Sequence, residues 1–162
     1  MWLDAYRDDD EAVFVEWCAD VHSYAFLRKS CPPSESPHQL FRCLATVSRA
    51  APRDNRIWAV RRAGNVVGHI ELKCTDKTGP TEREAVLLIA PGHRGKGYGG
   101  DAIRALIEEA PTIGGFDVML AVCRPTNEAS VHLVCKFGFG LARQDPDALW
   151  FRRPFEAFGD AG

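Results

Sequence analysis

Residues 90–103 read APGHRGKGYGGDAI and hold five glycines together with His93, Arg94 and Lys96. They lie between an apolar run, EAVLLIA, and a segment, DAIRALIEEA, whose apolar side chains recur at helical spacing. Glycines let the backbone approach an anion closely, and the free N–H groups at the start of a helix point toward that anion. This stretch therefore predicts a strand, a phosphate-binding loop and a helix in succession.

Two common phosphate motifs do not fit this loop. Gly95, Gly97 and Gly100 satisfy the dinucleotide pattern GxGxxG, but that loop follows the first strand of its domain, and an acid ends the next strand. Here the loop comes late in the chain, and the nearest acid, Asp117, begins a strand. A P-loop is excluded because no Gly-Lys-Ser/Thr closes the motif, and a protein kinase needs a much longer chain.

Size and composition narrow the class of protein. The chain has 162 residues, which is enough for one domain (residues 1–162) but too few for two ordinary ones. Its net charge of −2 argues against a nucleic-acid partner, which usually needs a basic face. The sequence holds no apolar run of about 20 residues and no secretory signal, so we expect no membrane partner and a cytoplasmic location.

The cysteines and histidines do not follow the spacing of metal sites. Six cysteines are scattered without a CxxC pair, which predicts reduced thiols that pack as small core residues, without disulfides or zinc. His69, His93 and His132 are likewise not spaced as ligands. We therefore expect no metal.

Periodicity along the chain predicts one α+β domain with a mixed sheet and four helices. The first helix begins near Asp8–Asp10, carries Val13, Trp17 and Val21 on one face, and ends at SCPPSESP. The others are expected in residues 37–50, in residues 101–110 up to Pro111, and in residues 127–137 with Gly138 as the cap. Strands are expected in residues 2–7, 84–90, 116–123 and 148–155 and on both sides of the turn 63–65, where one face of the second hairpin strand is the wetter one.

A second motif follows the predicted loop and one further strand. Residues 127–139, NEASVHLVCKFGF, begin with Asn127 and Ser130 and end with Lys136 and Gly138. Together with PGHRGKGYGGDAI, in this order, the motif resembles the two signatures of the GNAT N-acetyltransferase superfamily. Residues 4–20, DAYRDDDEAVFVEWCAD, resemble more loosely its branch of ribosomal-protein-alanine N-acetyltransferases.

The resemblance implies a mostly antiparallel sheet of about six to seven strands with two splayed central strands. It also implies acetyl-CoA as co-substrate, with the pantetheine arm along one splayed strand and the diphosphate on the loop amides. Asn127 would contact the cofactor or hold the loop, although asparagine is also a favoured helix cap. The cofactor-binding residues implied in this way are Leu87, Leu88, Ile89, Arg94, Gly95, Lys96, Gly97, Tyr98, Gly99, Gly100 and Asn127.

Acetyl transfer to an amine needs a base, and the resemblance places Glu84 in that role. An exposed acid at a strand start is the alternative reading of Glu84, and Glu71 is a lesser candidate base. Val134 stands where many relatives carry a tyrosine acid, so Ser130 is a substitute proton donor or a structural hydroxyl. Cys123 is read as a packing thiol rather than a nucleophile.

The acceptor is an amine, and we expect a protein or peptide N-terminus. An α-amine has a pKa of about 7.7–8.0 and loses its proton more readily than a lysine side chain. A small amine such as a polyamine or an aminoglycoside is the alternative, which acids such as Asp8–Asp10 around the acceptor cleft would favour. An acyl-CoA-binding sensor without catalysis and a homodimer also remain open. Trp17, Tyr24, Phe26 and Trp58 either line the cleft or belong to the core.

Overall fold

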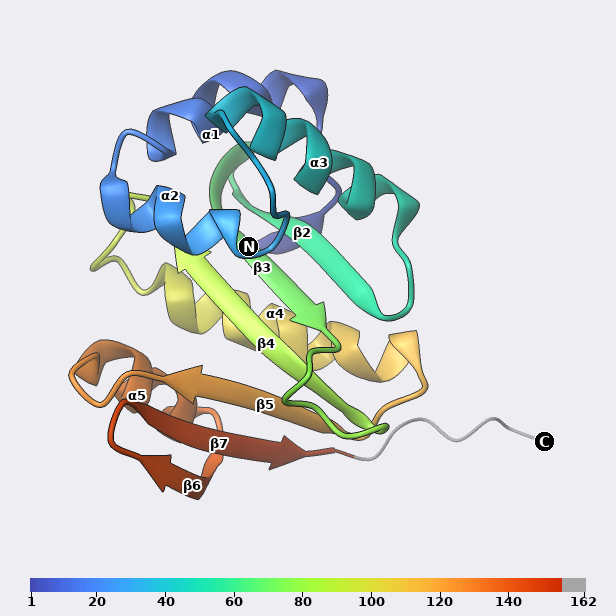
Figure 1. Cartoon of the computed structure of the whole chain (residues 1–162), viewed down its shortest axis with the longest axis vertical. Coiled ribbons are helices and arrows are strands. Elements are labelled where there is room, and N and C mark those ends of the chain that lie inside the picture. Colours follow the sequence, from blue (N-terminus) through green and yellow to red (C-terminus); the bar gives the residue numbers. More distant parts are fainter. Residues whose placement is uncertain (156–162) are drawn as a thin grey trace.

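A seven-stranded sheet in the order β1-β2-β3-β4-β5-β7-β6 runs through the computed structural model, which describes residues 1–155 (Figure 1). Neighbouring strands are antiparallel except for β4 and β5, which are parallel. The predicted α+β class is confirmed. The strands are β1 (Trp2–Asp4), β2 (Asn55–Arg62), β3 (Asn65–Lys73), β4 (Glu82–Ile89), β5 (Val118–Cys123), β6 (Gly140–Asp145) and β7 (Ala148–Pro154).

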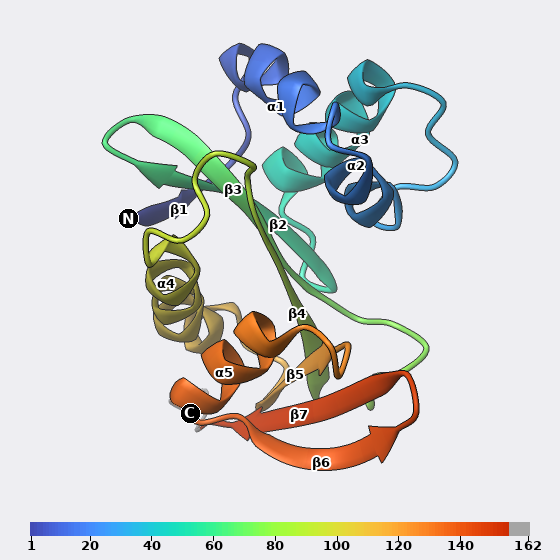
Figure 2. The ribbon, with the colours of Figure 1, turned by 90° about the vertical axis from the view of Figure 1, so that its left-hand side faces the viewer.

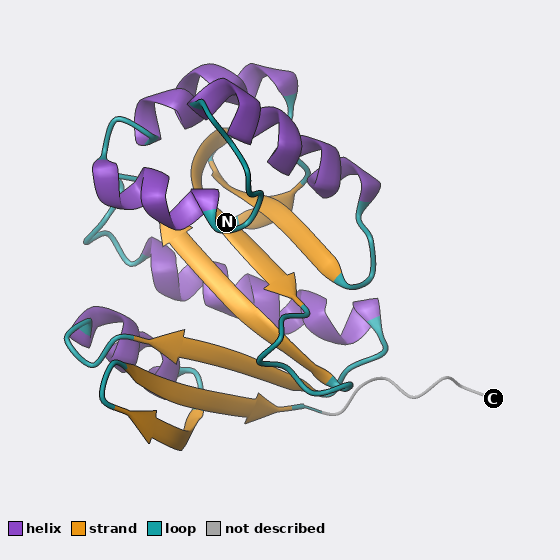
Figure 3. Cartoon of the chain, viewed as in Figure 1, coloured by secondary structure: helices purple, strands orange, loops and turns teal. Residues whose placement is uncertain are grey.

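Helices cover both faces of the sheet. The helices are α1 (Glu11–Trp17), α2 (Val21–Arg28), α3 (Pro37–Ala50), α4 (Tyr98–Ile113) and α5 (Glu128–Lys136), with a 3-10 turn η1 (Asp8–Asp10) before α1. Helices α1–α3 lie over β2 and β3 on one face, and α4 and α5 lie on the other face (Figures 2 and 3). Phe14, Leu40 and Ala59 belong to the first core, and Leu106 and Met119 to the second. None of the helices described is long and apolar enough for a membrane span.

The hairpin between β2 and β3 forms at the predicted turn, but neither face of its second strand, β3, is exposed to solvent. Ala63 and Gly64 both have positive φ, 49° and 81°, as a two-residue hairpin turn requires. On β3, His69 and Glu71 are 0% exposed, because α1–α3 cover this face while α4 covers the other. The alternating polar residues that predicted a wetter face are therefore a buried polar row.

The predicted first helix is divided into two, so residues 1–155 form five α-helices instead of four. The chain leaves the helix after Trp17 and starts again at Val21, whose side chain is 76% exposed. Asp20 ends the continuous helix because its carboxylate accepts hydrogen bonds from both the backbone N–H and the hydroxyl of Ser23. Helix α4, in contrast, continues through Pro111, the predicted stop, and ends before Gly114 at a φ of 72°.

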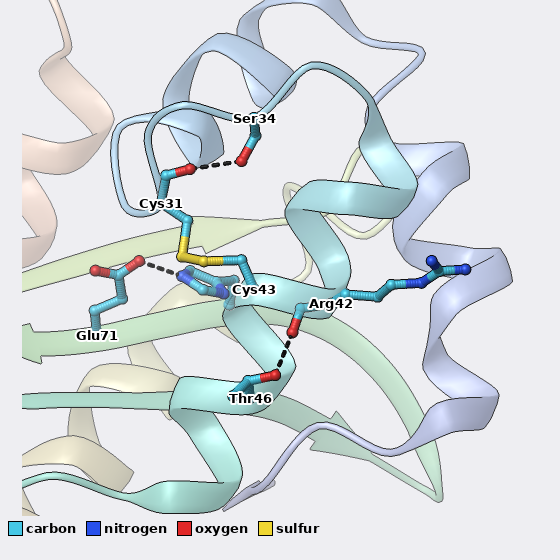
Figure 4. The surroundings of a disulfide bond; sticks show 7 residues. Cys31, Ser34, Arg42, Cys43, Thr46 and Glu71 are labelled. Carbon is cyan, nitrogen blue, oxygen red and sulfur yellow. Dashed lines mark hydrogen bonds and ion pairs between the residues drawn. A yellow bond between two sulfur atoms is a disulfide. The ribbon is translucent and has the colours of Figure 1, made fainter.

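Cys31 and Cys43 form a disulfide, which corrects the prediction that all six cysteines are reduced (Figure 4). The connection between α2 and α3 brings Cys31 within 6.3 Å (Cα–Cα) of Cys43 on α3. No local spacing signals this pair, because proximity arises only when the connection folds back over the helix. Of the free cysteines, Cys18 and Cys123 are buried as predicted, whereas Cys74 and Cys135 are exposed.

Candidate functional site

The central feature of the site is the separation of β4 from β5. The two strands pair only at Glu82–Val118, Arg83–Met119 and Glu84–Leu120, and β4 continues to Ile89 paired with β3 alone. The predicted splayed strands are therefore present. Leu87, Leu88 and Ile89 lie along the open edge of the gap, where no strand pairs with this side of β4 and an extended ligand could take its place.

The loop between β4 and α4 presents backbone N–H groups to solvent. Gly92, Gly95 and Gly97 have positive φ of 86°, 75° and 80°, and no atom lies within 4 Å of where a Cβ would stand at any of them. Gly97 is also the N-cap of the 16-residue helix α4, so the first N–H groups of this helix start at the loop. These residues fit a diphosphate, because the anion can approach the amides and the helix dipole without steric hindrance.

The other two glycines of the loop segment, Gly99 and Gly100, lie next to α5. A Cβ on Gly99 would lie 3.4 Å from the Leu133 side chain, and one on Gly100 would lie 3.5 Å from the Phe137 ring. Both neighbours belong to the α5 region. A methyl group at either position would make ordinary van der Waals contacts, so packing does not require glycine there, and the part of Gly99 and Gly100 in cofactor binding stays a prediction.

Arg94, which the sequence predicts at the diphosphate, makes its hydrogen bonds elsewhere. Its Nε donates to the Ile89 carbonyl at 3.0 Å, and its Nη2 donates to the Ser23 hydroxyl at 3.1 Å. Arg94 thereby ties the loop to the end of β4 and to the start of α2. Lys96 is exposed on the loop, and Tyr98 stacks with His93 at 6.2 Å between ring centres.

The second motif caps α5 beside the end of β5. The Asn127 side chain accepts a hydrogen bond from the Ser130 N–H at 3.2 Å, so its capping role is present, while its contact with a cofactor stays a prediction. Val134 is buried in the core and supplies no acid. Burial raises the pKa of the Cys123 thiol, which disfavours the thiolate that a nucleophile needs.

A row of polar side chains follows the face of β3 and ends at the point where β4 and β5 separate. The Tyr6 hydroxyl lies 2.8 Å from His69 Nδ1, His69 Nε2 lies 2.6 Å from Glu71 Oε1, and Lys73 Nζ lies 3.3 Å from Glu71 Oε2. Lys73 pairs across strands with Glu84, so both belong to this face. The alternation His69, Glu71, Lys73 is the sequence signal that could have revealed the row.

This row separates the two candidate bases. Burial alone would raise the pKa of Glu71. The hydrogen bond from His69 and the charge of Lys73 instead lower this pKa to about 2. So weak a base is poorly matched to proton removal near neutral pH. Glu84 is half-buried, stands at the last β4–β5 pair and takes no part in the Glu71 ion pair. The geometry therefore favours Glu84 over Glu71.

The acidic run Asp8–Asp10 lies away from the gap. Asp10 accepts two hydrogen bonds from the buried Arg61 guanidinium, and Asp8 pairs with Arg49 of α3 at 2.6 Å. Arginines of β2 and α3 therefore hold Asp10 and Asp8 near the edge of the sheet at β1. Trp58 likewise belongs to the core under α4, on the other face from Glu84.

Residues 1–140 match the family model described as an acetyltransferase (GNAT) domain. The chain belongs to the GNAT acetyltransferase family. It is therefore an acetyl-CoA-dependent N-acyltransferase, with the loop glycines and the open edge of β4 as the parts that would hold acetyl-CoA. Within residues 1–155, no group of three or more potential metal-ligating side chains comes together.

Solved structures with the same fold include several GNAT acetyltransferases. Spermidine N-acetyltransferase from Vibrio cholerae, in complex with CoA and spermine, is 18% identical, with 94% of each chain covered and a TM-score of 0.72. AAC(6′)-Ib with ribostamycin and coenzyme A is also 18% identical, covering 99% of this chain and 96% of that one at a TM-score of 0.73. A GNAT-family acetyltransferase from Streptococcus pneumoniae is 15% identical, with coverages of 95% and 98% and a TM-score of 0.67. No curated protein sequence matches the chain.

Proposed function

We propose that this GNAT protein transfers the acetyl group of acetyl-CoA to the primary amine of a small molecule. The observation that carries the proposal is the gap between β4 and β5, with open glycine amides at one end and Glu84 where the strands separate. Of the proteins of similar fold named above, one is a spermidine N-acetyltransferase, and AAC(6′)-Ib is an aminoglycoside acetyltransferase. Their names support a small-molecule acceptor over a protein.

In this proposal the chain has three tasks. The amides at the open loop glycines Gly92, Gly95 and Gly97 hold the diphosphate, and the open edge of β4 orients the pantetheine arm. Glu84 removes the proton from the amine, directly or through water. Acetyl-CoA supplies the activated thioester, and Ser130, in the first turn of α5, is the candidate donor of a proton to the leaving sulfur.

A protein or peptide N-terminus is the second candidate acceptor. Residues 4–20 resemble the ribosomal-protein branch, and an α-amine is the easier group to deprotonate for a site without the tyrosine acid.

The predicted cytoplasmic location has one observation against it. The Cys31–Cys43 disulfide is unusual for that compartment, where thiols are kept reduced.

The test is thiol release from acetyl-CoA with spermidine, an aminoglycoside and a dipeptide as acceptors. Glu84→Gln should lower kcat about 100-fold, because a positioned base contributes on that order, while CoA affinity measured by calorimetry stays at the wild-type value. Glu108→Gln, an exposed acid on α4, is the matched control and should keep full activity. Wild-type rates for Glu84→Gln would refute its role, and absent CoA binding at millimolar concentration would refute the function.

A further inference from the structure

Helix α2 has little buried apolar surface to hold its first turn in place. Of its eight residues, only Ser23 and Leu27 are buried, while Tyr24 and Phe26 are partly buried against the core under α1–α3. Ser23 is 1% exposed, although its side chain ends in a hydroxyl group. A buried hydroxyl is stable only with hydrogen-bond partners, so the contacts of Ser23 decide how this end of α2 is held.

One of these partners is Arg94, from the loop between β4 and α4. Its Nη2 donates to the Ser23 hydroxyl at 3.1 Å, and this hydroxyl donates in turn to Asp20 Oδ2 at 2.6 Å. Asp20 is the N-cap of α2 and also accepts a hydrogen bond from the Ser23 N–H at 3.0 Å. The Asp20 carboxylate lies 4.0 Å from the Arg94 guanidinium, so their opposite charges favour the same arrangement.

The same guanidinium is also bonded on the side where acetyl-CoA would lie. Its Nε donates to the carbonyl of Ile89 at 3.0 Å, and Ile89 is the last residue of β4, at the loop end of the open edge. Arg94 itself stands between Gly92 and Gly97, whose amides would hold the diphosphate. One side chain therefore connects the cofactor loop with the first turn of α2.

Helix α2 lies on the face of the sheet from which an amine would reach Glu84. Lys73 and Glu84 are cross-strand partners on the face that α1–α3 cover over β2 and β3. Figure 1 shows α2 across the end of β4, and Leu27 and Leu88 of these two elements belong to one core cluster. The position of α2 therefore helps to shape the path of an acceptor toward Glu84.

We propose that Arg94 is a positioning residue that links the two substrate sites, so that CoA on the loop holds α2 in place for the acceptor amine. The inference rests on the proposed acetyltransferase function. A diphosphate on the loop amides fixes the backbone that carries Arg94, so less conformational entropy is lost when the guanidinium holds Ser23. By reciprocity, an ordered α2 raises the affinity for CoA.

Hydrogen exchange followed by mass spectrometry tests this link on the whole chain and needs no knowledge of the acceptor. Saturating CoA should slow the exchange of amides in residues 21–28 at least about fivefold. In Arg94→Gln and in Ser23→Ala, this slowing should fall below about twofold, while CoA at saturation still slows exchange in residues 92–97. Lys96→Gln removes an exposed charge from the same loop and should keep the slowing in both segments.

Kinetics test the consequence for the acceptor, with whichever of spermidine, an aminoglycoside and a dipeptide the wild type acetylates fastest. Ser23→Ala should raise the KM for this amine about fivefold and leave kcat within about twofold, because Ser23 would shape the path of the amine without taking part in the reaction. In the Arg94→Gln background, Ser23→Ala should change this KM by less than about twofold, since the shared hydrogen bond is already gone. Independent effects of the two changes would overturn the inference.

The remaining outcomes separate the inference from the proposed function. If CoA slows exchange in the loop but leaves residues 21–28 unchanged, Arg94 does not link the sites, and the acetyltransferase function stands. Faster exchange in residues 21–28 would overturn the inference in another way, because the diphosphate would then draw Arg94 away from Ser23. Absent CoA binding at millimolar concentration, or CoA binding without turnover of any of the three amines, would overturn the proposed function together with the inference.

Discussion

Replacement of Glu71 by glutamine tests whether the buried polar row stabilises the fold through charge. The Glu71 side chain is 0% exposed and lies between His69 and Lys73 at 2.6 Å and 3.3 Å. Glutamine keeps the size of the side chain and can still form a hydrogen bond with His69, but it removes the negative charge. The Lys73 ammonium then loses its ion-pair partner.

The magnitude follows from the lowered pKa of Glu71. A fall from 4.5 in the unfolded chain to about 2 in the fold corresponds to about 3 kcal/mol of stability at pH 7. Because the folded pKa is the lower one, this contribution is complete above the unfolded pKa and is lost as the pH falls through the folded pKa. By pH 3, about 2 kcal/mol of it should be gone.

Urea unfolding at pH 7, 5, 4 and 3 measures this contribution. Glu71→Gln should be less stable than the wild type by about 3 kcal/mol at pH 7, and the difference should narrow to about 1 kcal/mol at pH 3. Glu108→Gln, at an exposed position on α4, should stay within about 0.5 kcal/mol of the wild type throughout. A difference that does not change with pH would show that Glu71 acts by packing rather than by charge.

The remaining predictions concern the loop and the disulfide. Gly97→Val should weaken CoA binding by at least tenfold, because a branched side chain at φ 80° blocks the approach of the anion; calorimetry measures this. Gly64→Val, at φ 81° in the hairpin turn, carries similar backbone strain and should leave CoA affinity unchanged, so equal losses would contradict the loop assignment. The double variant of Cys31 and Cys43 to serine should lose about 3 kcal/mol in urea unfolding, since the bond closes a short loop. A reductant should destabilise the wild type and leave the double variant unchanged. If the reductant does not change the stability of the wild type, the disulfide does not contribute to it.

The features that the sequence could predict are local ones. The apolar run before the loop, the glycines with positive φ and the apolar spacing after them lie within one continuous segment. Each fixes its own conformation through steric freedom or helical periodicity, with little help from distant residues. The hairpin turn at Ala63 and Gly64 was predictable for the same reason.

The features that the sequence could not predict depend on residues brought together by folding. Arg94 carries a charge that suits a diphosphate, yet its guanidinium bonds to Ser23, which is 71 positions away in the chain. Cys31 reaches Cys43 only through the fold of the connection between two helices.

The ion pairs of this face add a structural reason for preferring Glu84, which the sequence already placed ahead of Glu71 as the candidate base. Glu71 and Glu84 lie on neighbouring strands, and the sequence ranked them by resemblance alone, without a physical reason in their surroundings. Lys73 is the cross-strand partner of Glu84, yet its ammonium lies 3.3 Å from Glu71 on its own strand. A carboxylate held by a buried ion pair keeps its charge and is a weak base, whereas Glu84 lies outside that pair, at the point where β4 and β5 separate. The weakness of Glu71 as a base therefore depends first on its hydrogen bond with His69 and then on the Lys73 ammonium, and Lys73→Met should raise the pKa of Glu71 only in part, because the His69 contact remains.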